Sequence, residues 1–141
     1  MTEVEKTPIK ILSKDRDFYR FTAFTGVDYR VLAWPLNGAR LAAISWARSP
    51  PNTGAIPHAH ASSEEFVFII QGHGYIEDEN GKRYNWGPGD LLFYPPGTKH
   101  KIWSTGPEDM IAVSAQVPAD FLFFSLDKEL KKALDEYVRR L

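Results

Sequence analysis

Four side chains of the kind that bind metal ions lie in two short segments of the chain: His58, His60 and Glu65 in the first, and His100 in the second. Three neutral imidazoles and one carboxylate suit a divalent transition metal such as Fe, Mn, Ni, Co, Cu or Zn. On a strand, the i, i+2 spacing of His58 and His60 points both imidazoles to the same face. The sequence therefore predicts one metal site per chain, although a single histidine more often only satisfies hydrogen bonds.

The complete lack of cysteine narrows the kind of metal site. Disulfides, thiolate ligands, iron–sulfur clusters and a cysteine nucleophile are all excluded. Structural zinc sites are normally closed and rich in cysteine, so the composition favours an open site with exchangeable positions. An open position lets a metal ion polarise a bound oxygen or lower the pKa of bound water.

Charge and hydropathy argue against two classes of partner. The net charge of −1 gives no electrostatic reason to expect nucleic acid or an anionic membrane. No segment approaches the ~20 apolar residues of a membrane span, and the N-terminal MTEVEKTPIK lacks the apolar core of a signal peptide. We therefore expect a cytoplasmic protein that binds a small-molecule substrate or ligand.

Short apolar runs, separated by ten glycines and ten prolines, predict an all-β fold. Runs of β type lie at residues 8–12, 18–24, 28–34, 40–48, 65–70, 74–79, 82–86, 90–94, 100–104 and 110–117. Asn80-Gly81 predicts a hairpin with a type I′ turn, because both residues tolerate a positive φ. Pro95-Pro96-Gly97 predicts another tight turn. This spacing indicates an antiparallel barrel or jelly roll in a single domain, residues 1–141.

The C-terminal segment differs from the rest of the chain. From Leu126 onward, apolar residues such as Leu130, Leu134 and Leu141 recur at helical intervals. The pattern predicts an amphipathic helix over about residues 126–141. This helix either covers one end of the barrel or binds a partner, and the first role is the commoner one for such a helix.

The first of the two ligand-bearing segments resembles the first motif of the cupin superfamily, G-x5-H-x-H-x3,4-E-x6-G. The match consists of His58-x-His60, four residues, Glu65, six residues and Gly72. Only three residues separate Gly54 from His58, where the motif has five, so the opening turn departs from the motif. The spacing assigns the carboxylate to Glu65, because Glu64 does not leave six residues before Gly72.

The second segment resembles the second cupin motif, G-x5-P-x-G-x2-H-x3-N. The match consists of Gly89, five residues, Pro95-Pro96-Gly97, two residues and His100. Ser104 stands where the motif has Asn, which is not a metal ligand, so the metal site is unaffected. Two motifs that agree in order and spacing make the resemblance specific.

The resemblance covers roughly residues 40–117 and implies a double-stranded β-helix (jelly-roll) barrel, followed here by the C-terminal helix. It implies that His58, His60, Glu65 and His100 hold the metal. The superfamily spans dioxygenases, decarboxylases, isomerases, lyases and non-catalytic proteins, so the fold does not choose the reaction. We expect a metal-dependent, dioxygenase-like enzyme acting on a small, oxygen-rich organic substrate. The alternatives are a non-catalytic binding or sensing protein, and a metal-dependent isomerase, decarboxylase or lyase.

The residues that meet the substrate are harder to assign, and the sequence indicates no catalytic acid or base. Ile102 and Ser104 share the face of His100 if all three lie on one strand. Tyr94 is an aromatic candidate for the pocket, and a buried guanidinium at Arg48 would suit an anionic substrate. His73, in a Gly-His-Gly turn, is expected in a surface loop.

Two expectations concern the outer surfaces of the barrel. Val67 and Ile69 share a face with Glu65, while Phe66, Phe68 and Ile70 occupy the opposite face of the same strand. Because both faces are apolar, we expect this strand to be buried on both sides. The resemblance also implies a homodimer, since small single-domain cupins commonly pair through their sheets. The N-terminal strands, rich in Phe, Tyr and Val, are expected to supply that surface.

Overall fold

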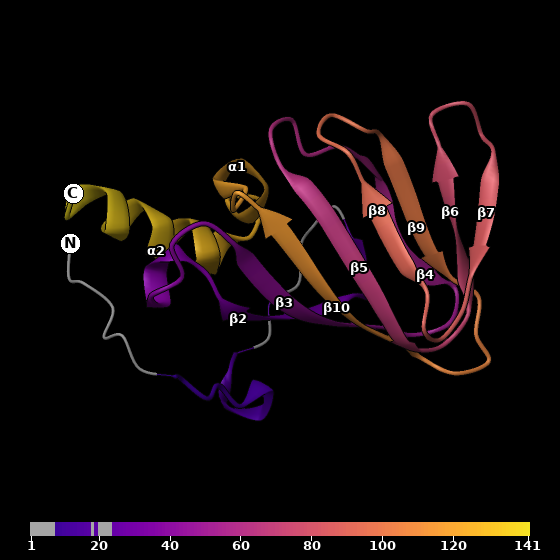
Figure 1. The fold of residues 1–141 in the computed structure, drawn as a ribbon, viewed down its shortest axis with the longest axis horizontal. Coiled ribbons are helices and arrows are strands. Elements are labelled where there is room, and N and C mark those ends of the chain that lie inside the picture. The colour runs from indigo at the N-terminus through magenta and orange to yellow at the C-terminus, as the bar shows by residue number, and fades with distance from the viewer. Residues whose placement is uncertain (1–7, 18, 20–23) are drawn as a thin grey trace.

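The computed structural model describes residues 8–17, 19 and 24–141, which form two five-stranded antiparallel sheets followed by two helices (Figure 1). The first sheet has the order β1-β4-β9-β6-β7, with bounds Phe24–Thr25, Thr53–His58, His100–Ser104, Gly74–Asp78 and Arg83–Trp86. The second has the order β2-β3-β10-β5-β8, with bounds Asp28–Ala33, Ala43–Ser49, Met110–Val117, Glu64–Gln71 and Leu91–Tyr94. Both sheets mix strands distant in sequence, as a jelly roll requires. The all-β prediction is confirmed.

The strand predictions hold best where the apolar pattern is strongest. The predicted strands at 100–104 and 110–117 coincide with β9 and β10. The predicted strand at 8–12 is wrong, because Ile9 and Leu12 remain 64% and 41% exposed and a 3-10 helix, Ser13–Asp15, follows. The prediction at 18–24 falls mostly outside the described residues.

Strand β4, which ends in His58, was missing from the predicted strands. It contains Gly54 and Pro57, two residue types that are depleted in strands. Glycine is required here because a Cβ at Gly54 would overlap the backbone carbonyl of Ile102 on β9. Close approach of two strands, rather than strand propensity, therefore determines this part of the fold.

The predicted hairpin at Asn80-Gly81 joins β6 to β7, but its turn is not type I′. Gly81 has φ of 81°, whereas Asn80 is not among the residues with positive φ. The Asp78 side chain instead accepts hydrogen bonds from the backbone N–H groups of Asn80 and Lys82. An Asx-type turn thus replaces the expected geometry.

Strand β5 is buried on one face only. Glu65, Val67 and Ile69 face the interior with 8%, 5% and 0% exposure, but Phe68 and Ile70 are 48% and 51% exposed. The expectation that β5 is buried on both sides is therefore wrong for the single chain. Leu91 and Phe93 of the neighbouring β8 are likewise about half exposed on this face.

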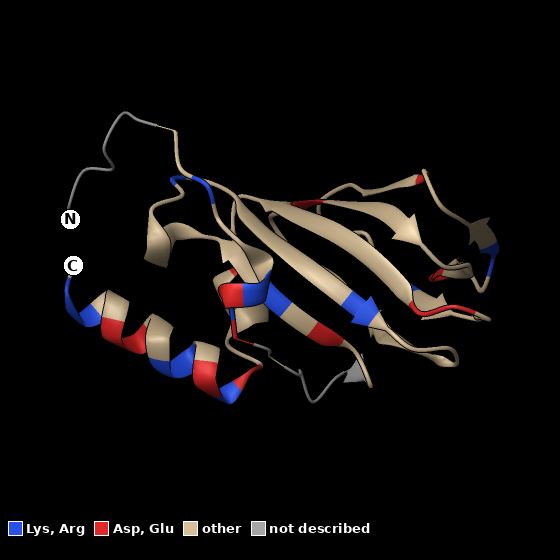
Figure 2. Cartoon of the chain, turned by 90° about the horizontal axis from the view of Figure 1, so that it is seen from below, with Lys and Arg blue, Asp and Glu red and all other residues tan. Residues whose placement is uncertain are grey.

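The two helices cover one end of the barrel, on the left in Figure 1. Helix α2 spans Lys128–Arg139, within the predicted range of 126–141, and is preceded by a short helix α1, Phe121–Phe124, that was not predicted. Leu130 and Leu134 of α2 are buried in a cluster with Trp34 and Phe124. The polar face of α2 alternates in charge along its length (Figure 2). These contacts confirm that α2 covers the end of the barrel.

No described helix is long and apolar enough to cross a membrane.

Candidate metal centre

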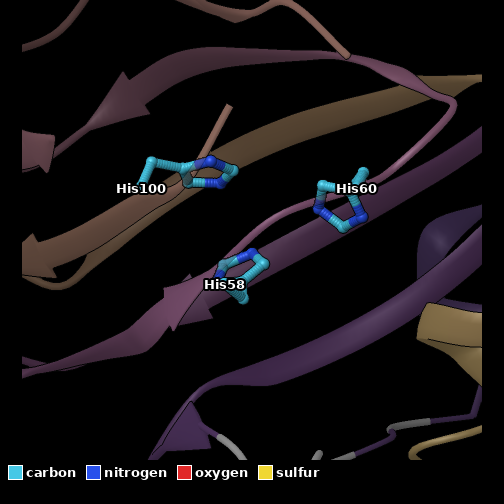
Figure 3. Close-up of side chains that lie close together, drawn as sticks. All are labelled: His58, His60 and His100. Carbon is cyan, nitrogen blue, oxygen red and sulfur yellow. The ribbon is translucent and has the colours of Figure 1, made fainter. Parts of the chain in front are cut away.

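Three histidines converge at the end of the barrel where β4 and β9 meet (Figure 3). His58 is the last residue of β4 and pairs with His100, the first residue of β9. Their ring centroids lie 4.4 Å apart, and those of His58 and His60 lie 5.1 Å apart. One nitrogen from each of the three rings lies within 4.8 Å of the others. This cluster could hold a metal ion.

The position of His60 in the cluster does not follow from regular strand geometry. Strand β4 ends at His58, so the two imidazoles do not project from one regular strand. The Gly97 N–H, in the Pro95-Pro96-Gly97 turn, donates to the His60 carbonyl oxygen at 2.8 Å. The turn of the second motif therefore fixes the backbone of a histidine in the first.

Two of the rings have their Nδ1 atoms held by backbone carbonyls. His58 Nδ1 lies 2.8 Å from the Ile56 oxygen, and His100 Nδ1 lies 2.9 Å from the Thr98 oxygen. Since a carbonyl oxygen only accepts, the hydrogen of each neutral ring belongs on Nδ1. The lone pair is then on Nε2, the nitrogen available for an ion.

The third ring is held by carboxylates. His60 Nδ1 lies 2.9 Å from Asp120 Oδ2, and its Nε2 lies 2.6 Å from Glu65 Oε2. The Nε2 contact is short but lacks hydrogen-bond geometry. Burial lowers the pKa of His60, but the bond to Asp120 and the contact with Glu65 outweigh it and raise this pKa to about 9. Burial raises the pKa of Glu65, but His60 outweighs it and holds that pKa low.

The other two histidines of the cluster, His58 and His100, favour the neutral form that metal binding requires. Burial lowers the pKa of His58, and burial together with the neighbouring His58 lowers the pKa of His100 to about 4. The Nε2 atom of His100 is buried without a hydrogen-bond partner among the described residues, whereas Nε2 of His60 has Glu65 Oε2 beside it at 2.6 Å. Buried polar atoms normally have a partner, so Nε2 of His100 fits a metal ion that accepts its lone pair.

Glu65, the second residue of β5, lies beside the three imidazoles. Its Oε2 contacts His60 and accepts a 3.3 Å hydrogen bond from Gln116 Nε2. The cluster of converging ligand atoms contains the histidines and not this carboxylate. The role of Glu65 as a fourth ligand therefore stays a prediction.

A cavity of about 30 Å³ adjoins the cluster, with room for one or two water molecules. His58 and Glu65 form part of its wall. The remaining lining residues are Tyr29, Ser45, Ala47, Ala55, Val67, Ile102, Met110, Ser114, Gln116, Phe123 and Phe124. The lining contains both polar and apolar side chains, so the cavity can orient a small polar ligand.

The four residues expected at the substrate pocket have different positions. Ile102 lines the cavity, and Ser104 lines a smaller neighbouring cavity. Tyr94 is buried and stacks on His100. Arg48 lies on the outer face of β3, with its side chain 44% exposed and paired with Asp109 at 2.8 Å. The expectation of a buried guanidinium at Arg48 is therefore corrected.

Several residues of the site were not expected from the sequence. Asp120 binds His60, and Phe123 of α1 packs edge-on against the same ring, with centroids 4.7 Å apart. Gln116 contacts Glu65 from β10. Asp120 precedes the apolar run Phe-Leu-Phe-Phe, which is a helix N-cap signal, but that signal does not indicate a metal site. His73 is exposed in a loop, as expected.

The fold and the site define a small jelly-roll protein with a histidine cluster of metal-binding type. A family model described as "Cupin domain" matches residues 45–115. The chain belongs to the cupin superfamily, and the resemblance seen in the two sequence motifs is confirmed.

The chain is also similar to an uncharacterized protein, MJ1618, from Methanocaldococcus jannaschii. The two are 35% identical over 57 residues, which make up 40% of this chain and 45% of that protein. The match thus spans less than half the length of this relative. It supports a shared core of the domain and carries no information on activity.

Three solved structures share the fold. The polyketide cyclase RemF from Streptomyces resistomycificus superimposes with a TM-score of 0.70 at 18% identity, over 79% of this chain and 80% of that one. A predicted oxalate decarboxylase from Thermotoga maritima gives 0.67 at 25% identity, over 79% and 100%. KdgF from Halomonas sp. gives 0.65 at 17% identity, over 77% and 94%. The jelly-roll architecture is therefore common to all four proteins.

Proposed function

We propose that this chain is a mononuclear metal enzyme of the dioxygenase type that acts on a small, oxygen-rich organic substrate. The observation that carries the proposal is the convergence of His58, His60 and His100 beside a cavity, with the Nε2 atom of His100 buried without a hydrogen-bond partner among the described residues. In the proposal these three residues and Glu65 hold one divalent transition metal ion. When bound, such an ion supplies Lewis-acid activation of a coordinated oxygen.

The groups around the cluster keep the ligands in place and give the adjoining cavity apolar walls. Backbone carbonyls orient His58 and His100, while Phe123 packs against the rings of His58 and His60. Val67 and Ile102 give the cavity apolar walls. Rigid support of this kind is what a metal site needs for reproducible ligand geometry.

The size and lining of the cavity support a small substrate. The cavity of about 30 Å³ is small, so it suits a small polar group of the substrate such as a carboxylate or an enolate. Burial and the nearby Glu65 raise the pKa of Tyr29, so its hydroxyl stays protonated and can donate to an anionic oxygen. Gln116 Oε1 is buried without a partner and can accept from a ligand hydroxyl. The cavity thus suits a ligand that carries both an anionic oxygen and a hydroxyl group.

The proposal is tested by oxygen uptake. Iron-loaded protein is mixed with a panel of enols, 1,3-diketones and aromatic diols, with the His60→Ala variant and a His73→Ala variant as controls. We expect uptake by the wild type and by the loop variant, and none by His60→Ala. Silence of the wild type with every substrate and every metal contradicts the proposal.

A second candidate is a metal-dependent decarboxylase, isomerase or lyase that does not use oxygen. Similarity to the predicted oxalate decarboxylase, over the whole of that chain, favours it. Product formation under strict anaerobiosis identifies this reaction class. A ligand that raises the melting temperature without being consumed identifies a binding or sensing protein instead.

We further propose that the chain forms a homodimer through the outer face of the β2-β3-β10-β5-β8 sheet. Phe68, Ile70, Leu91 and Phe93 are each about half exposed on this face. An exposed apolar area of this kind commonly marks an interaction surface. The N-terminal residues first expected to form the interface lie partly outside the described residues. The expected cytoplasmic location also stays a prediction.

A further inference from the structure

Asp120 contacts a histidine of the metal centre from outside both sequence motifs. Its Oδ2 lies 2.9 Å from His60 Nδ1, across 60 residues of sequence. Its other oxygen, Oδ1, accepts a 3.0 Å hydrogen bond from the Phe123 backbone N–H, which makes Asp120 the N-cap of α1. One carboxylate thus joins the C-terminal helices to the histidine cluster.

The backbone before Asp120 is fixed independently of the imidazole. The Ser63 hydroxyl donates to the Pro118 carbonyl at 2.6 Å, and the Ala119 N–H donates to the Leu41 carbonyl at 2.7 Å. Together with the helix cap, these bonds set the position of the carboxylate. The carboxylate can therefore impose an orientation on His60 rather than follow it.

His60 needs such support more than the other two histidines do. His58 and His100 end and begin paired strands, and their Nδ1 atoms meet carbonyls only two residues away in sequence. His60 lies beyond the end of β4, where no ladder fixes its side chain. A carboxylate that accepts from a ligand histidine fixes the tautomer and the ring orientation, and it raises the basicity of the other nitrogen.

We propose that Asp120 is a positioning residue of the metal site: it accepts the Nδ1–H of His60 and so keeps the lone pair of His60 on Nε2, the nitrogen beside Glu65. The inference rests on the proposed metal-binding function. It assigns to the C-terminal segment a part in ion affinity as well as in covering the barrel.

The informative substitution is Asp120→Asn, because the amide has one oxygen where the carboxylate has two. If that oxygen caps Phe123, the amide NH₂ faces His60 Nδ1 and favours the tautomer with hydrogen on Nε2, which cannot bind an ion. If it accepts from His60, the cap is lost. Asn and Asp are similar as N-caps, so the fold is expected to survive.

Asp127→Asn is a matched control. Asp127 is the N-cap of α2 and accepts from the Leu130 N–H at 2.9 Å, and it bonds to no histidine in the described part of the chain. The two variants lose the same charge at the same kind of position. A difference between them therefore reports on His60 and not on helix capping.

The first measurement is zinc affinity, by competition with a chromophoric chelator. We expect Asp120→Asn to bind Zn²⁺ about 10- to 100-fold more weakly than the wild type, and Asp127→Asn to differ by less than about threefold. Asp120→Glu, which keeps both oxygens, is expected to recover part of the loss. Equal affinity of Asp120→Asn and the wild type overturns the proposal while metal binding itself stands.

The second measurement does not depend on metal. Two-bond ¹H–¹⁵N correlation spectra of the metal-free protein, above the His60 pKa of about 9, report which nitrogen of the neutral ring carries the hydrogen. We expect hydrogen on Nδ1 in the wild type and in Asp127→Asn, and a shift toward Nε2 in Asp120→Asn. An Nε2–H form in the wild type overturns the proposal. If the wild type binds no zinc, the proposed function fails, and these spectra still decide the role of Asp120.

Discussion

Tyr94 and His100 stack face to face, with ring centroids 3.6 Å apart and planes inclined by 4°. Tyr94 ends β8 and is 3% exposed, and His100 begins β9 after the Pro95-Pro96-Gly97 turn. The Thr98 carbonyl holds the same imidazole at Nδ1. The turn between the two strands therefore places the His100 imidazole against the Tyr94 ring, with its Nδ1 at the Thr98 carbonyl.

The stack predicts different effects for two substitutions of Tyr94. Tyr94→Ala leaves a cavity beside His100 and is expected to lower the free energy of unfolding by about 3–5 kcal/mol, as for other large aromatic residues in cores. Tyr94→Phe keeps the ring and removes a buried hydroxyl that has no partner among the described residues. We expect it to be neutral or slightly stabilising. Urea unfolding of both variants checks this, and equal losses contradict it.

Removal of single histidines is expected to reduce the metal content of the purified protein. His58→Ala, His60→Ala and His100→Ala each remove one of the three converging nitrogens. His73→Ala is the matched control, because His73 is exposed in a loop. Elemental analysis is expected to show close to one ion per chain for wild type and control, and much less for the other three. Undiminished metal in the three variants contradicts the assignment.

The sequence predicts the parts of the site that depend on short spacing. The two motifs place three histidines in two segments, and alternation along β5 correctly turns Glu65, Val67 and Ile69 to one face. Both follow from local chain geometry. Asp120 could not be found this way, because its contact with His60 depends on how the chain returns after β10.

Strand β3 shows why the sequence could not place the Arg48 side chain inside or outside the barrel. Its inward residues are small, Ala43, Ser45, Ala47 and Ser49, while Ile44, Trp46 and Arg48 face outward. Small residues facing inward leave room for the cavity, so the larger apolar side chains of this strand lie outside. The alternation of side chains along a strand defines its two faces. In β3 the face with the larger apolar side chains is the outer one, so residue size does not identify the interior face.

The proposed homodimer predicts that one charge on the exposed sheet face separates the subunits. Phe68 and Ile70 of β5 lie beside Leu91 and Phe93 of β8, and Phe66 stacks on Phe93 with centroids 5.0 Å apart. Phe68→Lys places a charge in this apolar area, which is costly to bury. Sedimentation velocity is expected to show a dimer for the wild type and a monomer for Phe68→Lys.

Val138→Lys provides the control for that experiment. Val138 is an apolar residue with 58% exposure near the end of α2, away from the sheet face. We expect this variant to remain dimeric. A monomeric wild type removes the dimer proposal, and a Phe68→Lys dimer moves the interface elsewhere.

The opposite pKa shifts of His60 and His100 predict that the metal-free protein is most stable near pH 6.5. The pKa of His60 is raised from 6.5 to about 9, so its contribution to stability is full below 6.5 and is lost as the pH rises through 9. The pKa of His100 is lowered from 6.5 to about 4, so its contribution is full above 6.5 and is lost as the pH falls through 4. Each loss amounts to at most about 3 kcal/mol.

Urea unfolding in the presence of a chelator, from about pH 4 to about pH 9, measures both limbs of this curve. His60→Gln removes the group that titrates on the alkaline side and is expected to flatten that limb. It also makes the acidic limb shallower, because His60 no longer lowers the pKa values of Glu65 and Asp120, but the part that is due to His100 remains. His100→Gln is expected to do the reverse. Because the lowered pKa values of Glu65 and Asp120 also cost stability as the pH falls, some acidic slope remains in His100→Gln. A wild-type curve that rises steadily through pH 9 contradicts the assignment of a charged His60 between two carboxylates.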